Sequence, residues 1–182
     1  GFMCRADILE ELGYKAEDIK NFDDIEEVLK KCQEVHPELY PMIPSDLNNG
    51  CFLNYVKGEF DVVTSGVGVD IDDDASDGIT VINTYDTEKY KEMAEKAYDW
   101  NQKGYFMPDS TTNTTTRQDL FRANTAFSYY GNQHPGTATQ ETMNSGKEIV
   151  SIPIGRSTIS TSSVNFCQWA IPAQCENPKK AL

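Results

Sequence analysis

The chain has 182 residues, of which 38% are hydrophobic and 10% aromatic, which is enough for a globular domain with a core and too much for a disordered segment. Its formal net charge of −13 argues against nucleic acid as a partner, because neutralising phosphates requires a surplus of Lys and Arg. The sequence holds no apolar run close to the roughly 20 residues that cross a membrane.

The cysteine pattern matches neither a zinc site nor a disulfide framework. There are five, an odd number with no C-x-x-C pair: Cys4, Cys32, Cys51, Cys167 and Cys175. Unpaired cysteines fit a reducing environment, either the cytosol or the outside of an anaerobe. Cys32 falls on the apolar face of a predicted helix, so we predict it to be a small core residue.

The first third of the sequence predicts two helices and two strands. Residues 6–12 form a short helix, and Asn21 caps a second helix that ends at Pro37. The apolar residues of the second helix recur at helical spacing and are predicted to face the core: Phe22, Ile25, Val28, Leu29, Cys32 and Val35. Strands are predicted at residues 39–43 and 60–63.

An acidic hairpin comes next. Residues 67–71 and 79–82 predict two strands around the acidic turn at 72–78. Three acids match the first ligand positions of an EF-hand loop: Asp70, Asp72 and Asp74. Ala75 and Val81, however, stand where the loop needs its glycine and its bidentate glutamate. We favour a solvated turn without metal, and calcium binding is the alternative.

A long helix follows the hairpin. Thr87 caps it, it covers residues 88–103, and Gly104 ends it. Its apolar residues lie on one narrow stripe that we assign to the core: Tyr90, Met93, Ala94, Ala97 and Trp100. Trp100 is therefore not predicted to contact a ligand. Residues 105–116 form a polar link.

Residues 121–143 are predicted to position a binding site. Residues 117–123 are interpreted as a turn that leads into a strand at 125–130, and a helix follows at about 138–143. Ligands of α/β proteins settle at the carboxyl ends of strands. The loop between this strand and this helix is therefore expected to line such a site.

The side chains around this loop suit a polyhydroxylated ligand such as a sugar. The candidate contacts here are Tyr129, Tyr130, Asn132, Gln133 and His134. Aromatic rings stack on the C–H faces of sugar rings, and amides both donate and accept hydrogen bonds. Because neighbours on a strand face opposite sides of a sheet, we expect one tyrosine in the core and leave the other open between core and ligand.

The last third of the sequence adds two strands, at residues 148–153 and 163–172, and two further candidate contacts, Asn165 and Trp169. The alternative for Trp169 is a core position beneath the final helix. Helices and strands mix without strict βαβ alternation, which predicts an α/β fold with a mixed sheet and helices on its faces. Because Asn177 and Pro178 open a helix just before the sequence stops, we expect an excised piece of a longer protein.

Enzyme signatures are weak. No G-x-S-x-G motif occurs, and the glycines at Gly66 and Gly68 lack the third glycine of a dinucleotide loop. His36 is expected to cap carbonyls at a helix end. A thiol pair of Cys167 and His134 is conceivable, but nothing in the sequence brings them together. We expect no catalytic residues, no metal and no cofactor.

Four stretches carry a resemblance to a known family. They are NFDDIEEVLKK at 21–31, the strand, helix and W-x-x-x-G segment at 81–104, FRANTAF at 121–127, and the ending WAIPAQCENPKKAL at 169–182. In this order they resemble the family 1 extracellular solute-binding proteins, the receptors of sugar-type ABC importers, and most of all their lipoprotein-type members in Gram-positive bacteria. Asn124 departs from the family pattern, which has a small residue there, and Cys175 and Glu176 replace its Ser-Lys.

The resemblance implies a type II periplasmic-binding-protein-like clamshell, in which two α/β lobes close on a ligand. Residues 1–182 would be one three-layer lobe, most of the second, with the loop after Tyr130 and the strand end near Trp169 lining the cleft. The whole protein would be a non-enzymatic, monomeric, extracellular receptor, lipid-anchored to a Gram-positive cell. It would deliver a carbohydrate or related small polar solute to a membrane permease.

Two other function classes stay open. A sugar-active hydrolase would need a pair of catalytic carboxylates across a cleft. A cell-surface adhesion module would instead show an exposed apolar or aromatic patch.

Overall fold

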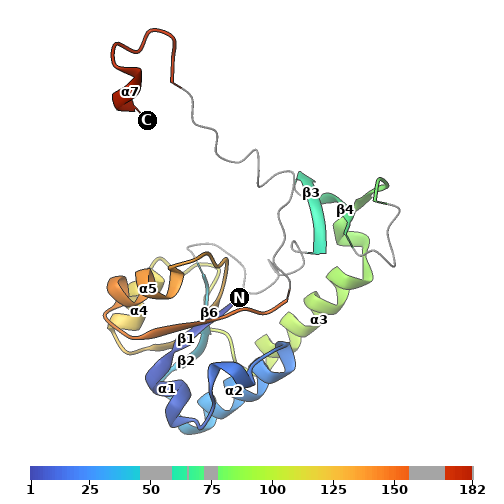
Figure 1. The fold of residues 1–182 in the computed structure, drawn as a ribbon. Helices are drawn as coiled ribbons and strands as arrows, with labels where there is room; N and C mark the ends of the chain where they lie inside the picture. Colours follow the sequence, from blue (N-terminus) through green and yellow to red (C-terminus); the bar gives the residue numbers. More distant parts are fainter. Residues whose placement is uncertain (46–58, 65, 72–77, 156–170, 182) are drawn as a thin grey trace.

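A four-stranded sheet organises the larger part of the molecule (Figure 1). The computed structural model describes residues 1–45, 59–64, 66–71, 78–155 and 171–181. The strands, in the spatial order β2-β6-β1-β7, are β2 (Tyr40–Ile43), β6 (Ala126–Tyr130), β1 (Phe2–Arg5) and β7 (Ile149–Ile152). β2 runs parallel to β6, and β1 runs antiparallel to both β6 and β7. The strands β2, β6 and β7 therefore share one direction.

Residues 105–107 extend this sheet beyond β2. Phe106 forms a parallel bridge with Met42. The Met42 N–H donates to the Tyr105 carbonyl at 2.9 Å, and the Met107 N–H donates to the Met42 carbonyl at 2.9 Å. The segment after Met107 therefore leaves the sheet at the same edge as the residues that follow β2.

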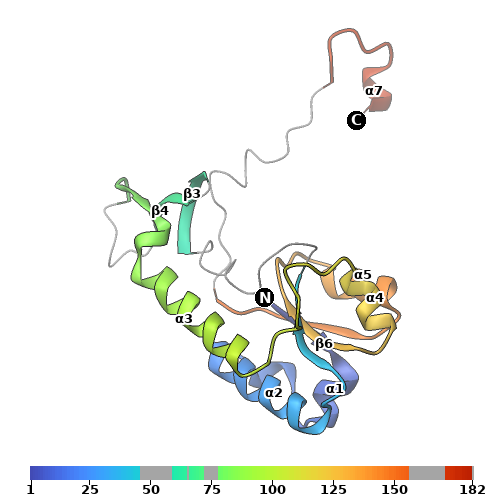
Figure 2. The same ribbon diagram turned by 180° about the vertical axis from the view of Figure 1, so that it is seen from behind.

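Helices cover both faces of the sheet and give three layers (Figures 1 and 2). One core cluster joins β1, through Phe2 and Cys4, to the helices α1 (Ala6–Glu11), α2 (Phe22–Val35) and α3 (Glu88–Gln102). The other joins Met3 to Leu120 and Phe121 of α4 (Arg117–Arg122), beside which α5 (Thr137–Ser145) lies. The expected α/β mixed-sheet fold is confirmed.

A second, three-stranded sheet lies at one end of α3 (Figure 1). It consists of the antiparallel strands β3 (Phe60–Thr64), β4 (Val67–Asp70) and β5 (Val81–Asn83). Lys89 of α3 pairs with Asp70 at 2.8 Å and lies 5.6 Å from the centre of the buried Phe60 ring. The predicted hairpin strands are confirmed, and the acidic residues 72–77 lie outside the described ranges.

The helix ends follow the predicted capping chemistry. The Asn21 side chain accepts hydrogen bonds from the N–H groups of Asp23 and Asp24, and the Thr87 hydroxyl accepts one from the Tyr90 N–H. Gly104 takes a positive φ of 76° just after α3, a conformation that glycine adopts without steric cost. The shorter helices are η1 (Ala16–Asp18), η3 (Thr84–Asp86) and α7 (Pro178–Ala181).

Three features of the local structure differ from what the sequence predicted. Residues 117–122 are the helix α4 where a turn was expected at 117–123, because Thr116 caps the Asp119 N–H while Leu120 and Phe121 are buried. The strand β1 was not predicted, and Val35, at the end of α2, is 43% exposed. His36 does cap a carbonyl at the helix end: its backbone N–H donates to the Cys32 carbonyl at 2.7 Å, and its ring contacts the carboxylates of Glu38 and Glu11 at 3.0 and 3.3 Å.

The unusual residue in the FRANTAF stretch, Asn124, has a structural explanation. Its φ of 57° lies in the left-handed region, which glycine and asparagine tolerate better than other residues. Its side-chain oxygen accepts a hydrogen bond at 3.1 Å from the buried Arg5, which also pairs with Asp7 at 2.5 Å. The Arg5 guanidinium holds the pKa of Asp7 below its ordinary value.

The variant Asn124→Ala should be less stable than the wild type by about 1–2 kcal/mol, because it strains the left-handed backbone and removes the bond from Arg5. Asn124→Gly loses only the hydrogen bond and should lose less stability. Urea denaturation of both variants measures the difference. Equal stability of Asn124→Ala and the wild type would contradict this explanation.

Candidate functional site

The carboxyl ends of β2, β6 and β7 meet at one edge of the four-stranded sheet, which we term the carboxyl edge. Ser45 follows β2, and Gly131 follows β6. The Gly131 N–H donates to the Gly1 carbonyl at 3.0 Å. A Cβ atom at Gly131 would lie 3.3 Å from that of Ser45, so the ends of β2 and β6 are in close contact here. Parallel strand ends of this kind are where α/β proteins bind ligands.

Both predicted tyrosines are buried. Tyr129 is 2% exposed and lies against Phe121, and Tyr130 is 5% exposed and lies 5.4 Å from the Phe22 ring. They belong to the core clusters on opposite faces of the sheet. Both rings therefore pack in the core in this structure, and a ligand contact for either of them stays a prediction.

Two side chains of the loop after β6 are exposed, Asn132 and His134. The loop is fastened to the start of α5, because the His134 N–H donates to the Thr137 hydroxyl at 2.9 Å and that hydroxyl donates to the His134 carbonyl at 2.8 Å. Asn132 and His134 thus stand on a fixed loop at the carboxyl edge with their side chains in solvent.

Gln133 lies between Asn132 and His134 in the sequence, is half-buried, and contacts both β1 and β7. Its side-chain NH₂ group lies 3.1 Å from the Ile152 carbonyl, 3.1 Å from the Met3 sulfur and 3.5 Å from the Phe2 carbonyl. The side chain also covers Gly1, where an added Cβ would lie 2.1 Å from the Gln133 Cδ. The donors of Gln133 therefore serve the ends of β1 and β7 in this structure.

The remaining predicted contacts, Asn165 and Trp169, lie outside the described residues, as does Cys167. Burial raises the pKa of the Cys4 thiol, and it raises the pKa of the Cys32 thiol to about 12. These two side chains are protonated at neutral pH and behave as core residues, as predicted for Cys32.

A partly buried ion pair beneath the carboxyl edge was not predicted from the sequence. The Arg117 guanidinium donates to the Ser45 carbonyl and, at 2.8 Å, to the carboxylate of Glu141, which is 4% exposed. The guanidinium also lies 5.0 Å from the centre of the Tyr129 ring. Arg117 thereby connects α4, α5, β6 and the end of β2. The two charged residues are 24 positions apart, so no local spacing points to their contact.

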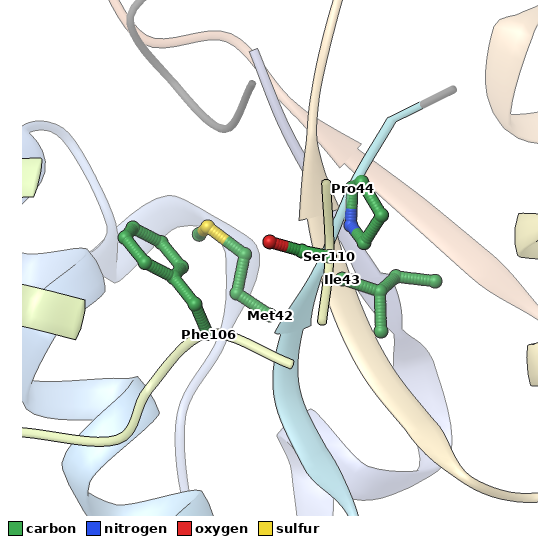
Figure 3. Close-up of a pocket in the computed structure, with 5 residues that line it drawn as sticks. All are labelled: Met42, Ile43, Pro44, Phe106 and Ser110. Atoms are coloured by element: carbon green, nitrogen blue, oxygen red, sulfur yellow. The ribbon is translucent and has the colours of Figure 1, made fainter. Parts of the chain in front are cut away.

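A small hollow lies at the end of β2 (Figure 3). It is lined by Met42, Ile43, Pro44, Phe106 and Ser110. The space inside it is about that of one water molecule, so the hollow does not enclose a ligand by itself.

A metal centre and a membrane-spanning helix are both absent from the described ranges. There, no cluster of three or more His, Cys, Asp or Glu residues could hold a metal ion. The helices in the same part of the chain are all too short or too polar to cross a membrane.

No family profile matches this sequence, and neither does any curated protein. Solved structures do match. Over 99% of its length the chain superimposes on the N-glycan transport solute-binding protein NgtS of Streptococcus pneumoniae, crystallised with Man5GlcNAc, with a TM-score of 0.70 and 21% sequence identity. The chain has the fold of a sugar-transport solute-binding protein.

Two further solute-binding structures agree. Binding protein MsmE of Bacillus subtilis matches 85% of the chain with a TM-score of 0.58 and 15% identity. Sugar transporter BL01359 of Bacillus licheniformis, in complex with stachyose, matches 85% with a TM-score of 0.55 and 14% identity. The chain spans 38% of the NgtS chain and 39% of each of the other two. The type II periplasmic-binding-protein-like fold implied by the sequence resemblance is confirmed.

Proposed function

We propose that these residues form one ligand-binding lobe of an extracellular solute-binding protein that delivers a carbohydrate to an ABC importer. The observation that carries the proposal is the match over 99% of the chain to a glycan-transport solute-binding protein. The match to FusA of Streptococcus pneumoniae in complex with kestose, with a TM-score of 0.56 and 17% identity over 84% of the chain, supports it.

The proposed contacts follow from exposure at the carboxyl edge. Asn132 and His134 would bind sugar hydroxyls, because an exposed amide and an imidazole offer both donors and acceptors. Gln133 would hold the loop through its NH₂ group and offer its side-chain oxygen. Asn165 and Trp169 remain proposed contacts.

The remaining features of the proposal concern the whole protein. A second lobe would close over the carboxyl edge, exclude water and supply the other half of the ligand contacts. In this proposal the protein releases the ligand to a membrane permease and is not an enzyme, so the ligand would leave unchanged. The receptor would be a lipid-anchored, extracellular monomer.

A thermal-shift assay of the full-length gene product against a panel of sugars tests this function. An oligosaccharide that binds only the folded protein should raise its melting temperature. Asn132→Ala should then weaken binding of that sugar by about 1–3 kcal/mol, the cost of leaving buried polar partners unpaired.

Asn144→Ala is the matched control. Asn144 is exposed and lies in the last turn of α5, whereas the His134 loop leads into the first turn of that helix. It should bind the sugar like the wild type. A panel without any shift would contradict the carbohydrate proposal, and so would hydrolysis of the bound sugar. Equal affinity of Asn132→Ala and the wild type would remove Asn132 from the site.

A further inference from the structure

Exposed apolar side chains gather on the three-stranded sheet at the start of α3. Among the described residues, four of the seven large hydrophobic side chains that are exposed belong to this sheet or follow it directly: Val63, Ile79, Val81 and Tyr85. Their exposed fractions run from 52% to 80%. Single apolar residues are normal on a protein surface, whereas a gathering of them on one element marks a contact surface.

The strand pairing shows which face of this sheet is uncovered. Val69 lies opposite Val81, and Val67 lies two residues before Val69, so these three side chains share one face. We term it the valine face. The other face, with Val62 and Ile82, packs into the core cluster that includes α3. Neither core cluster of described residues contains the three valines. The sheet is therefore apolar on both faces and packed on one of them.

The valine face borders the space beyond the carboxyl edge. Lys89 of α3 contacts Phe60 of the three-stranded sheet, and Trp100, about three turns further along the same side of α3, contacts α2 and Phe106. Both sheets thus lie on one side of α3. The segment 105–107 follows α3 and runs parallel to β2, so α3 starts on the carboxyl side of the four-stranded sheet. Figures 1 and 2 both place the three-stranded sheet beyond the N-terminus, which lies at the carboxyl edge.

The chemistry of the valine face suits a protein surface better than a sugar. Aliphatic side chains neither donate nor accept hydrogen bonds. A sugar pressed against them would leave its hydroxyl groups without partners, which costs free energy. An apolar protein surface has no such cost and gains from removing the valines from water.

The size of the valine face points to a partner within the same polypeptide. Complexes of separate chains use roughly 20–30 residues on each side, whereas the three strands hold only 5, 4 and 3 residues. A covalent connection gives the partner a high effective concentration, so a smaller contact is sufficient. A second copy of the chain is also disfavoured by the net charge of −13, because like charges repel.

We propose that the valine face packs against the second lobe of the full-length protein. The matched NgtS chain is more than twice as long as this one, which spans 38% of it, so a protein of that size holds enough further chain to cover the face. The proposal rests on the proposed function, in which the second lobe closes over the carboxyl edge. It adds a direct contact between the lobes, away from the ligand, made by Val67, Val69 and Val81.

Photo-cross-linking of the full-length gene product tests this contact. The photoreactive residue p-benzoylphenylalanine replaces Val81, and the protein is irradiated with and without the sugar that raises its melting temperature most. Mass spectrometry of the monomer band should find residue 81 joined to a peptide outside residues 1–182. Ile79, which is 80% exposed beside the valine face, is the second position for the same replacement if the first variant does not fold.

The same replacement at Tyr98 is the control, because this side chain is 69% exposed on α3. It should give about tenfold less of the cross-link to peptides outside residues 1–182, since an exposed side chain far from a contact surface has no fixed partner. Equal yields at the two positions would overturn the proposal. A link from residue 81 only within residues 1–182, a link only between two copies, or no link in either condition would overturn it as well. These results leave the proposed function standing if a sugar raises the melting temperature of the wild type, and a panel without any shift overturns that function.

Discussion

Replacing Trp100 by alanine should reduce the free energy of unfolding by about 3–5 kcal/mol, the range for removing a large aromatic side chain from a core. Trp100 of α3 is fully buried against α2 and the segment 105–107. The ring centres of Phe22, Tyr105 and Phe106 lie 6.2–6.3 Å from the ring centre of Trp100. Its indole N–H donates to Glu26 at 2.9 Å. The substitution opens a cavity and removes this bond between two helices.

Tyr98→Ala, on the same helix, is the matched control. The Tyr98 side chain is 69% exposed, so its removal should change stability by less than about 0.5 kcal/mol. Urea denaturation followed by circular dichroism measures both variants. A Trp100→Ala variant as stable as Tyr98→Ala would show that the α2–α3 contact contributes little to the fold.

Helical periodicity was sufficient to place Trp100. Its spacing from Met93 predicted a buried stripe, and both residues are buried. The strand β1 has no comparable local pattern, because it consists of only four residues buried along their whole length. Arginine side chains are mostly exposed in proteins, yet Arg5 at the end of β1 is buried through its contacts with Asp7 and Asn124. Such partners are set by the tertiary fold.

The position of the candidate loop was predicted from the sequence, and its contact with a ligand stays a prediction. The position of the loop at the ends of parallel strands followed from the strand, loop and helix order, and Asn132 and His134 are exposed there. Of Tyr129 and Tyr130, one was expected in the core and the other was left open between core and ligand. Helices cover both faces, so a strand inside the sheet buries side chains on both sides.

The sequence did not predict polar contacts between elements that are distant in the chain. The amide of Gln133 suits a hydroxyl ligand and a backbone carbonyl equally well, and only the fold brings Ile152 within 3.1 Å of it. The hollow at Phe106 and Ser110 depends on the parallel bridge between Met42 and Phe106, and no local sequence pattern predicts that bridge.

Arg117→Leu should destabilise the protein by about 3–5 kcal/mol, because it leaves the buried carboxylate of Glu141 without its cationic partner. Glu141 is 4% exposed, and among the described residues only the Gln118 amide would still bond its carboxylate after the change, at 3.2 and 3.4 Å. The same substitution removes the hydrogen bond to the Ser45 carbonyl. It should therefore also weaken sugar binding by the full-length protein.

Arg122→Leu, on the same helix, provides the comparison. Arg122 and Asp119 form an ion pair with both side chains more than half exposed, and such pairs contribute about 0–1 kcal/mol. The double variant Arg117→Leu with Glu141→Leu should recover much of the loss, since two apolar side chains leave no buried charge. Urea denaturation of the four proteins separates the explanations. If the double variant is less stable than Arg117→Leu, the cost lies in lost packing around Tyr129 and Ser45 rather than in an unpaired carboxylate.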